Sequence, residues 1–316
     1  MKKENMDRRR LNEGGLPFRE ISGWGRAKDY LQLTKPSLNI MVVFSSVLSF
    51  ALTPAFEQYV DKWKWILLLF AGGYLVTGGA NAMNMAAEKK TDALMNRTKN
   101  RPVAAGRMSQ EEAWLVGAVM GVAGAFILGY FFNWLAAGVA VFSLFLYAFI
   151  YTPLKTVNSI AVLAGAIPGS MPCLIGWAAG ENKLSTGGWV LFAIQFLWQF
   201  PHFWAICWIA WKDYLKAGFK LLPSEQGPTK FTALQAIIYS LVLIPATLAP
   251  YYTGMCSIDD VKGKISLVLV SLANLFMIMR CINLFRYLDT GAARKVMFGS
   301  YMYLPVVLLA LLLSKV

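Results

Sequence analysis

The sequence has 316 residues, of which 57% are hydrophobic and only 15% are charged, whereas about 25% of the residues of a soluble globular protein are charged. This composition excludes a soluble enzyme, a disordered protein and a disulfide-stabilised scaffold. The 30 basic and 17 acidic residues leave a net charge of +13, which is compatible with nucleic-acid binding, anionic lipid, membrane orientation or an anionic substrate.

The first 36 residues are polar and basic and precede the first long apolar run. They lack the apolar core and cleavage site of a secretory signal, and their acidic residues argue against a mitochondrial transit peptide. Residues 24–35 are predicted to form a short helix at the membrane interface, before Pro36. We therefore expect residues 1–36 to be a basic cytoplasmic segment, distinct from a membrane domain formed by residues 37–316.

Nine apolar runs follow, and each is long enough for a helix that crosses a bilayer, which takes about 17 to 25 residues. The third and fourth runs are separated only by Phe132 and Asn133, so we expect a very short turn between them. The sequence thus predicts an all-α, polytopic membrane protein with nine transmembrane helices. The runs are residues 37–53, 65–87, 113–131, 134–150, 159–179, 187–211, 232–253, 265–285 and 297–314.

The distribution of positive charge predicts how these helices are oriented. With nine spans and a cytoplasmic N-terminus, 24 of the 30 lysine and arginine residues lie on the cytoplasmic side. Cytoplasmic loops are enriched in these residues. We therefore expect the N-terminus inside and the C-terminus outside, and we attribute most of the excess charge to membrane orientation.

The cytoplasmic loop after the second run contains Asn84, Glu88 and Asp92 at four-residue intervals. On an α-helix this spacing forms one stripe about 12 Å long, and its oxygen atoms suit Mg²⁺ that is bound to substrate phosphates. Arg97 and Arg101 follow, and their planar guanidinium groups can bind a diphosphate in a bidentate manner. The alternative is a solvated loop whose charges only set the membrane topology.

The only histidine, His202, lies within the sixth run beside Pro201. Ionisable side chains at membrane depth are costly and point to a function. Asp213 returns to nearly the same helix face about 16 Å closer to the cytoplasm, and Gln199 lies near the same stripe. The alternative is a histidine that bonds to a carbonyl of a neighbouring helix. A single histidine is also too few for a bis-histidine haem centre.

A third polar patch lies between the fourth and fifth runs, where Pro153 marks a break. It places Lys155 and Asn158 on the same cytoplasmic side as the two loops above. Lys155 is the only charge in this connection. Its position leaves open whether it binds a phosphate or caps a helix.

Together these motifs resemble the UbiA superfamily of intramembrane prenyltransferases, and in particular its haem-farnesylating branch. The resemblance extends from L-T-K-P at 33–36 to about residue 305. The blocks that carry it are N-x-x-x-E-x-x-x-D at 84–92, M-N-R-T-K-N-R-P at 95–102, Y-T-P-L-K at 151–155, W-Q-F-P-H-F at 198–203 and D-Y-x-x-A-G at 213–218.

Two positions depart from the superfamily pattern. Glu88 stands where an aspartate is usual, although a longer carboxylate can still bind Mg²⁺, and Asp213 is flanked by lysines instead of further carboxylates. The resemblance implies a bundle of nine helices around a central cavity that opens toward the cytoplasm and laterally toward lipid.

The activity that the resemblance implies is transfer of the farnesyl group of farnesyl diphosphate to a vinyl group of haem B. Water is added in the same reaction, and the products are haem O and diphosphate. Mg²⁺ would be bound through the diphosphate, and haem B would be a substrate instead of a permanent cofactor. The implied catalytic and metal-binding residues are Asn84, Glu88, Asp92 and Asp213.

His202 is implied to position the haem, either as an iron ligand or by a hydrogen bond. The full set of residues implied in substrate binding is Arg97, Arg101, Lys155, Asn158, Lys212, Tyr214, His202, Trp198 and Gln199.

Other functions stay open at this point. A UbiA-type prenyltransferase acting on a quinone precursor or another acceptor gives no reason for His202 in the membrane. A transporter usually shows an internal repeat, and a membrane haem carrier would not need Glu88 and Asp92. We expect the bacterial cytoplasmic membrane as the location, and no nucleic acid as a partner. A downstream haem-modifying enzyme or an oxidase assembly factor is a further candidate partner.

Overall fold

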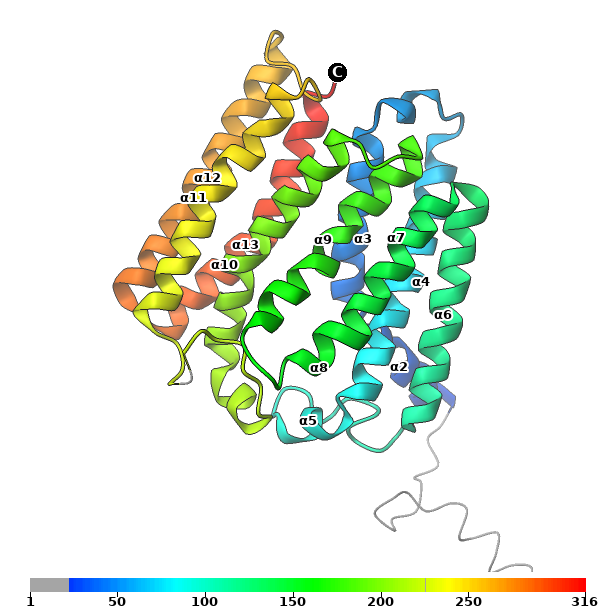
Figure 1. The fold of residues 1–316 in the computed structure, drawn as a ribbon, viewed down its shortest axis with the longest axis vertical. Helices are drawn as coiled ribbons and strands as arrows, with labels where there is room; N and C mark the ends of the chain where they lie inside the picture. Colours follow the sequence, from blue (N-terminus) through cyan, green and yellow to red (C-terminus); the bar gives the residue numbers. More distant parts are fainter. Residues whose placement is uncertain (1–22, 225) are drawn as a thin grey trace, which may run out of the picture.

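The computed structural model describes residues 23–224 and 226–316, and these ranges are almost entirely helical (Figure 1). The predicted helix at 24–35 is present, whereas the rest of the basic segment, residues 1–22, lies outside the described residues. The helices are α2 (Gly23–Thr34), α3 (Pro36–Leu52), α4 (Lys62–Ala87), α5 (Lys89–Leu94), α6 (Gln110–Phe131), α7 (Trp134–Phe145), α8 (Thr152–Leu154), α9 (Ile160–Glu181), α10 (Thr186–Lys216), α11 (Lys230–Tyr252), α12 (Val261–Tyr287) and α13 (Thr290–Leu313), with a 3-10 turn η2 (Pro54–Gln58) and a π-helical turn η3 (Leu146–Tyr151).

Eight helices of the described ranges are long and apolar enough to cross a membrane. One of them runs from Trp134 to Leu154 and comprises α7, η3 and α8. The 17-residue α3 follows α2 across a bend of 41°, and the two helices are long and apolar enough for a ninth span only when they are taken together. The prediction of an all-α, multi-pass membrane protein is therefore confirmed, and the count of nine holds when the bent pair is included.

The expected short break between the third and fourth apolar runs is confirmed. Phe132 follows the last residue of α6, and Asn133 caps α7 by accepting a hydrogen bond from the Ala136 amide at 2.9 Å. An asparagine in this position satisfies a backbone amide that has no partner within its helix. Asn133 also donates to the Ala178 carbonyl of α9 at 2.7 Å, which fixes the turn against the bundle.

Glycines allow α4 and α6 to pack with their backbones in contact. A Cβ atom on Gly124 would lie 2.6 Å from the carbonyl oxygen of Gly72, and one on Gly79 would lie 2.6 Å from that of Gly117. Helices in a membrane associate through such small residues, because close backbone approach maximises van der Waals contact. This contact anchors α4, the helix that leads into the first predicted site loop.

Pro172 within α9 leaves one backbone carbonyl without its helical partner, and a neighbouring helix satisfies that carbonyl. Pro172 has no N–H for the Pro168 carbonyl, which accepts a hydrogen bond from Ser143 Oγ of α7 at 3.2 Å. Ser46 of α3 donates to the Pro172 carbonyl at 2.5 Å. Because lipid offers no hydrogen bonds, such bonds between helices let a proline-containing helix span the membrane. They also fix α9 against α3 and α7.

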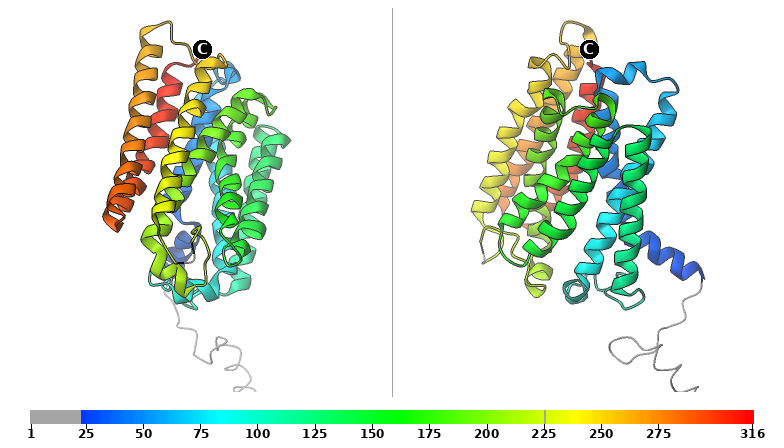
Figure 2. Two further views of the ribbon diagram at one scale, coloured as in Figure 1. Left: turned by 60° about the vertical axis from the view of Figure 1, so that its left-hand side comes forward. Right: turned by 45° about the vertical axis from the view of Figure 1, so that its right-hand side comes forward.

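Both ends of the bundle are visible in Figures 1 and 2. The C-terminus lies at the upper end of Figure 1, whereas α5, α8 and the connection between α10 and α11 gather at the lower end. Segments that are far apart in the sequence therefore meet at one end of the bundle. These segments carry the three polar patches that the sequence analysis singles out.

Candidate active site

The predicted stripe of Asn84, Glu88 and Asp92 spans a helix break. α4 ends at Ala87, and Glu88 adopts φ −91° and ψ 13° before α5 begins. The four-residue hydrogen bonds nevertheless continue, from the Glu88 amide to the Asn84 carbonyl at 2.9 Å and from the Asp92 amide to the Glu88 carbonyl at 2.8 Å. All three side chains are buried. The stripe is therefore interrupted at Glu88, between α4 and α5, but its three side chains keep the four-residue spacing of a helix.

Each member of the stripe is bonded to one basic side chain, of which Lys35 has its pKa lowered to about 7 by burial. Lys155 Nζ donates to Glu88 Oε1 at 2.7 Å, and Arg101 Nη1 donates to both carboxylate oxygens of Asp92 at 2.8 Å. Lys35 Nζ donates to Asn84 Oδ1 at 2.9 Å. The three basic side chains come from three different segments of the chain: the α2–α3 junction, the segment after α5, and the α8–α9 connection.

The pair of Lys155 and Glu88 keeps both charges. Burial alone raises the pKa of Glu88, but the positive charges of Lys155, Lys35 and Arg101 outweigh burial and hold this pKa below its usual value. Burial lowers the pKa of Lys155, but the attraction of Glu88 prevails and raises it above its usual value. Both groups are therefore charged at neutral pH.

The second acidic position, Asp213, is bound to the same segment that carries Arg97. Asp213 accepts hydrogen bonds from Asn96 Nδ2 and from the Arg97 backbone amide, both at 3.3 Å, and lies 3.9 Å from Lys216 Nζ. These bonds join the end of α10 to the segment after α5. Within the described ranges, no three His, Cys, Asp or Glu side chains converge tightly enough to hold a metal ion. Asp213 as a ligand beside Glu88 stays a prediction.

The side chains of Arg97 and Lys212 are exposed, whereas Tyr214 is buried. Diphosphate binding by Arg97 and Lys212 stays a prediction.

α2 is bound to the segment that carries Arg101. Arg107 forms a fork with Asp29 of α2, with Nε at 3.0 and 3.1 Å from the two carboxylate oxygens and Nη2 at 2.9 Å from Oδ1. Arg107 Nη2 also donates to the Asn100 carbonyl at 3.0 Å. At the other end of α2, the Thr34 carbonyl accepts a hydrogen bond from Asn81 Nδ2 at 3.2 Å.

His202 lies in the middle of α10, which continues through Pro201. Its Nδ1 is 2.7 Å from Ser300 Oγ of α13, so the neighbouring-helix partner is a hydroxyl and not a carbonyl. Its ring stacks on Trp198 at 5.0 Å and 13°, and the edge of Tyr301 lies 4.9 Å away. Nε2 makes no hydrogen bond with any residue that the structure describes.

Two of the predicted binding residues are engaged elsewhere. Gln199 Nε2 donates to Ser170 Oγ at 2.7 Å and to the Ala166 carbonyl at 3.1 Å, both in α9, so its amide does not share the α13-facing surface of His202. Gln199 and His202 are three positions apart, which corresponds to a turn of about 300° around the helix, so the two side chains point in different directions. Asn158 is exposed and accepts a hydrogen bond from the Ile160 amide at the start of α9.

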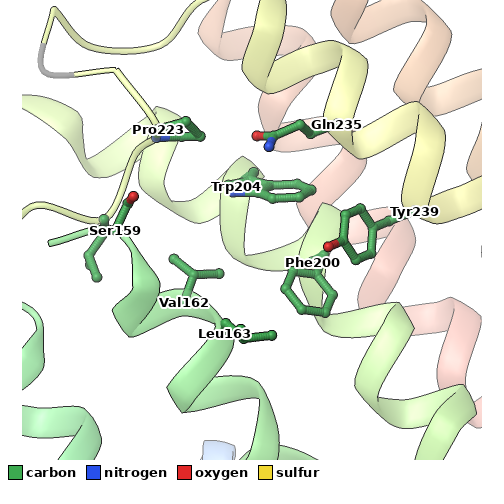
Figure 3. Close-up of a pocket in the computed structure, with 9 residues that line it drawn as sticks. Ser159, Val162, Leu163, Phe200, Trp204, Pro223, Gln235 and Tyr239 are labelled. Atoms are coloured by element: carbon green, nitrogen blue, oxygen red, sulfur yellow. The ribbon is translucent and has the colours of Figure 1, made fainter.

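A pocket of about 190 Å³ lies between α9, α10 and α11 (Figure 3). Phe200, Trp204 and Tyr239 form its aromatic wall, and Gln235 lies at its edge with an unpaired buried Oε1. None of the predicted site residues lines this pocket. It faces the side of α10 that carries Phe200 and Trp204, whereas His202 contacts α13.

Residues 41–305 match the UbiA prenyltransferase family, and the chain belongs to this family. It is 41% identical to a protoheme IX farnesyltransferase of Flavobacterium johnsoniae over 91% of this chain and 94% of the relative. It is 40% identical to a protoheme IX farnesyltransferase of Cytophaga hutchinsonii over 91% of this chain and 97% of the relative. These matches confirm the resemblance inferred from the motifs, and the chain is a multi-pass membrane prenyltransferase.

The fold is shared with solved structures. A digeranylgeranylglyceryl phosphate synthase has a TM-score of 0.72 at 20% identity, over 91% of this chain and 98% of that one. A UbiA homologue from Archaeoglobus fulgidus, bound to GPP and Mg²⁺, has a TM-score of 0.63 at 14% identity, over 90% of this chain and 99% of that one. At these identities the likeness establishes the fold alone.

Sequence reasoning missed two residues of this arrangement. Lys35 belongs to the L-T-K-P block, where a lysine directly before the first apolar run is the available signal. Ser300 bonds to His202, and nothing in the sequence distinguishes it from the other serines of the apolar runs. Only the contact between α10 and α13 identifies Ser300.

Proposed function

We propose that this chain transfers the farnesyl group of farnesyl diphosphate to a vinyl group of haem B, with addition of water, and releases haem O and diphosphate. The similarity to protoheme IX farnesyltransferases over nine-tenths of the chain supports this reaction. The observation that carries it is the combination, in one bundle, of three cation–oxygen pairs at one end and an anchored histidine with a free Nε2 in α10.

The oxygen stripe fits Mg²⁺ bound to a diphosphate. Asn84, Glu88 and Asp92 would hold the ion, and Asp213 would complete the set from the α10 side. Carboxylate and amide oxygens are the hard ligands that Mg²⁺ prefers, and the ion binds readily to substrate phosphates. When bound, it supplies positive charge that stabilises the departing diphosphate.

The cations of the chain act on the diphosphate itself. Lys35, Lys155 and Arg101 each bond to one member of the stripe, so they already lie next to the oxygen atoms that would bind the metal. A diphosphate offers these cations a stronger anionic partner than a single carboxylate. Arg97 and Lys212, both exposed, add positive charge at the same end.

The proposed transfer proceeds through an allylic cation. The bond between C1 of the farnesyl group and the diphosphate oxygen breaks, and its electron pair leaves with the diphosphate. The allylic cation is attacked by the π-electrons of the vinyl group, and a new carbon–carbon bond forms. Water adds to the carbon next to the porphyrin and loses one proton. Fixed positive groups around the diphosphate favour the first step, because the developing negative charge needs no reorganisation of the site.

The second substrate is assigned to the region of His202. An imidazole held on one side by Ser300 and stacked on Trp198 presents its other nitrogen in a fixed direction. Such a group can bind a haem iron, whereas an aromatic acid acceptor would have no use for it.

We place the chain in the bacterial cytoplasmic membrane, with the N-terminus in the cytoplasm and the C-terminus outside. Two observations support this orientation: the excess of positive charge on one side, and the location of the C-terminus at the end of the bundle opposite α5. Both substrates would then enter the diphosphate end from the cytoplasm or from the bilayer. Haem O would pass to a haem-modifying enzyme or an oxidase assembly factor.

The reaction is tested by incubating the purified protein in lipid nanodiscs with haem B, farnesyl diphosphate and Mg²⁺. The expected pigment is heavier than haem B by one farnesyl and one hydroxyl group. Asp92→Asn serves as the inactive control, and an exposed variant at the opposite end, Lys183→Ala, as the active one. Product from an aromatic acid acceptor alone would assign the chain to quinone synthesis. Absence of any prenylated product would instead favour a haem carrier or a transporter.

A further inference from the structure

The hydroxyl group of Ser300 has a single proton, and its surroundings determine where that proton points. Ser300 Oγ lies 2.6 Å from the Met297 carbonyl oxygen and 2.7 Å from His202 Nδ1. A carbonyl oxygen can only accept a hydrogen bond. Ser300 therefore donates to Met297 and turns a lone pair toward His202.

This arrangement specifies the tautomer of His202. With Ser300 as the acceptor, Nδ1 carries the proton, and in a neutral imidazole the other nitrogen then has a free lone pair. No carboxylate of the described residues contacts His202, so nothing favours the doubly protonated ring. Its neighbours are Trp198, Tyr301 and Phe203, together with Ser300.

Three contacts also fix the direction of the ring. Trp198 stacks on one face of His202, and Trp198 Nε1 donates to the Ser300 carbonyl at 2.8 Å. Ser300 thus bonds to Trp198 through its backbone carbonyl and to His202 through its hydroxyl group. The edge of Tyr301 closes another side of the imidazole. Nε2 remains as the unbonded atom of the ring.

We propose that Ser300 is a positioning residue for haem binding, which holds His202 as the Nδ1–H tautomer so that Nε2 can ligate the haem iron. The inference rests on the proposed function, in which haem is the acceptor substrate. A histidine that ligates a metal nearly always donates its other N–H to a fixed acceptor, which orients the ring and strengthens the ligand. A bond of this kind would hold the porphyrin beside α10.

The test compares haem binding by Ser300→Ala, Ser300→Thr and the wild type, each in nanodiscs. Ser240→Ala is the matched control, because Ser240 is equally buried and bonds to a backbone carbonyl of its own helix, α11. Ser300→Ala is expected to weaken haem binding by about 10- to 100-fold. It should also lower the Fe–His stretching frequency of the ferrous complex, because Nδ1–H loses its acceptor.

Ser300→Thr keeps the hydroxyl group and should retain both properties, whereas a merely structural serine would not make the Fe–His frequency depend on the hydroxyl. An unchanged affinity and frequency in Ser300→Ala would overturn the inference. A haem spectrum that is the same in the wild type and in His202→Ala would overturn it as well. Normal histidine ligation without any farnesylated product would contradict the proposed reaction and leave the role of Ser300 intact.

Discussion

Lys155 and Glu88 are separated by 67 positions in the sequence, and their side chains form an ion pair of 2.7 Å in which each exposes less than a tenth of its surface. A buried pair of this kind has little net effect on stability, because desolvation of the two charges offsets most of their attraction. Such a pair can be opened by a ligand that carries more negative charge. It therefore suits a site where a lysine and a carboxylate both serve a diphosphate and its metal ion.

The first prediction concerns this pair. Lys155→Met leaves Glu88 buried without a partner, which should lower the free energy of unfolding by about 3–5 kcal/mol. In the double variant Lys155→Met/Glu88→Leu, most of the lost stability should be regained. Binding of farnesyl diphosphate should nevertheless be abolished in both variants. Thermal unfolding and a titration with farnesyl diphosphate and Mg²⁺ measure the two effects. Normal binding by the double variant would exclude both residues from the diphosphate site.

The second prediction concerns Asp92, whose two carboxylate oxygens both accept a hydrogen bond from Nη1 of Arg101. Asp92→Asn removes the negative charge that would hold the metal, so turnover should fall more than about a hundredfold even at saturating Mg²⁺. Asp259→Asn, at an exposed position of the opposite end, should leave turnover unchanged. Wild-type turnover by Asp92→Asn would remove this residue from the metal site.

The third prediction concerns the fork between Asp29 and Arg107. Because it binds α2 to the segment that carries Arg101, Asp29→Asn should raise the KM for farnesyl diphosphate by about tenfold, the effect of losing about 1.4 kcal/mol. The KM for haem should not change. Arg26→Ala is the control on the same helix, since Arg26 pairs with Glu112 at 3.6 Å in an exposed contact. Equal changes in both KM values would indicate general destabilisation.

The fourth prediction separates the two substrates. His202→Ala should weaken or abolish the binding of haem B and leave the binding of farnesyl diphosphate unchanged, because the two regions use different side chains. Spectroscopic titration measures the first, and equilibrium binding of labelled farnesyl diphosphate the second. Haem affinity equal to that of the wild type would refute the assignment of His202.

The fifth prediction concerns the packing of α4 on α6. A Cβ atom on Gly124 would lie 2.6 Å from a backbone oxygen, so Gly124→Ala forces the helices apart and should cost about 1–3 kcal/mol. At Gly138 of α7 there is open space, and Gly138→Ala should be neutral or stabilise by up to about 1 kcal/mol. Thermal unfolding in detergent compares the two. Equal stability of the variants would show that the α4–α6 contact is not tight.

Much of the fold follows from local properties of the sequence. The length of the apolar runs predicts the helices, and the break at Asn133 is confirmed to the residue. The bend between Ala87 and Lys89 was not predicted, because a four-residue spacing is equally compatible with one straight helix and with two joined by a turn. Local patterns therefore specify which segments are helical, but not how adjacent segments are joined.

The sequence by itself determined the class of the protein, its all-α multi-pass architecture and the residue types that meet at one end of the bundle, since apolar length, charge and motif spacing are local features. Only the tertiary structure decided the pairing. It matched Lys155 with Glu88 and Lys35 with Asn84, turned Gln199 toward α9, and joined His202 to Ser300. Such contacts depend on which helices are neighbours and how each is rotated, and many weak packing interactions settle both together.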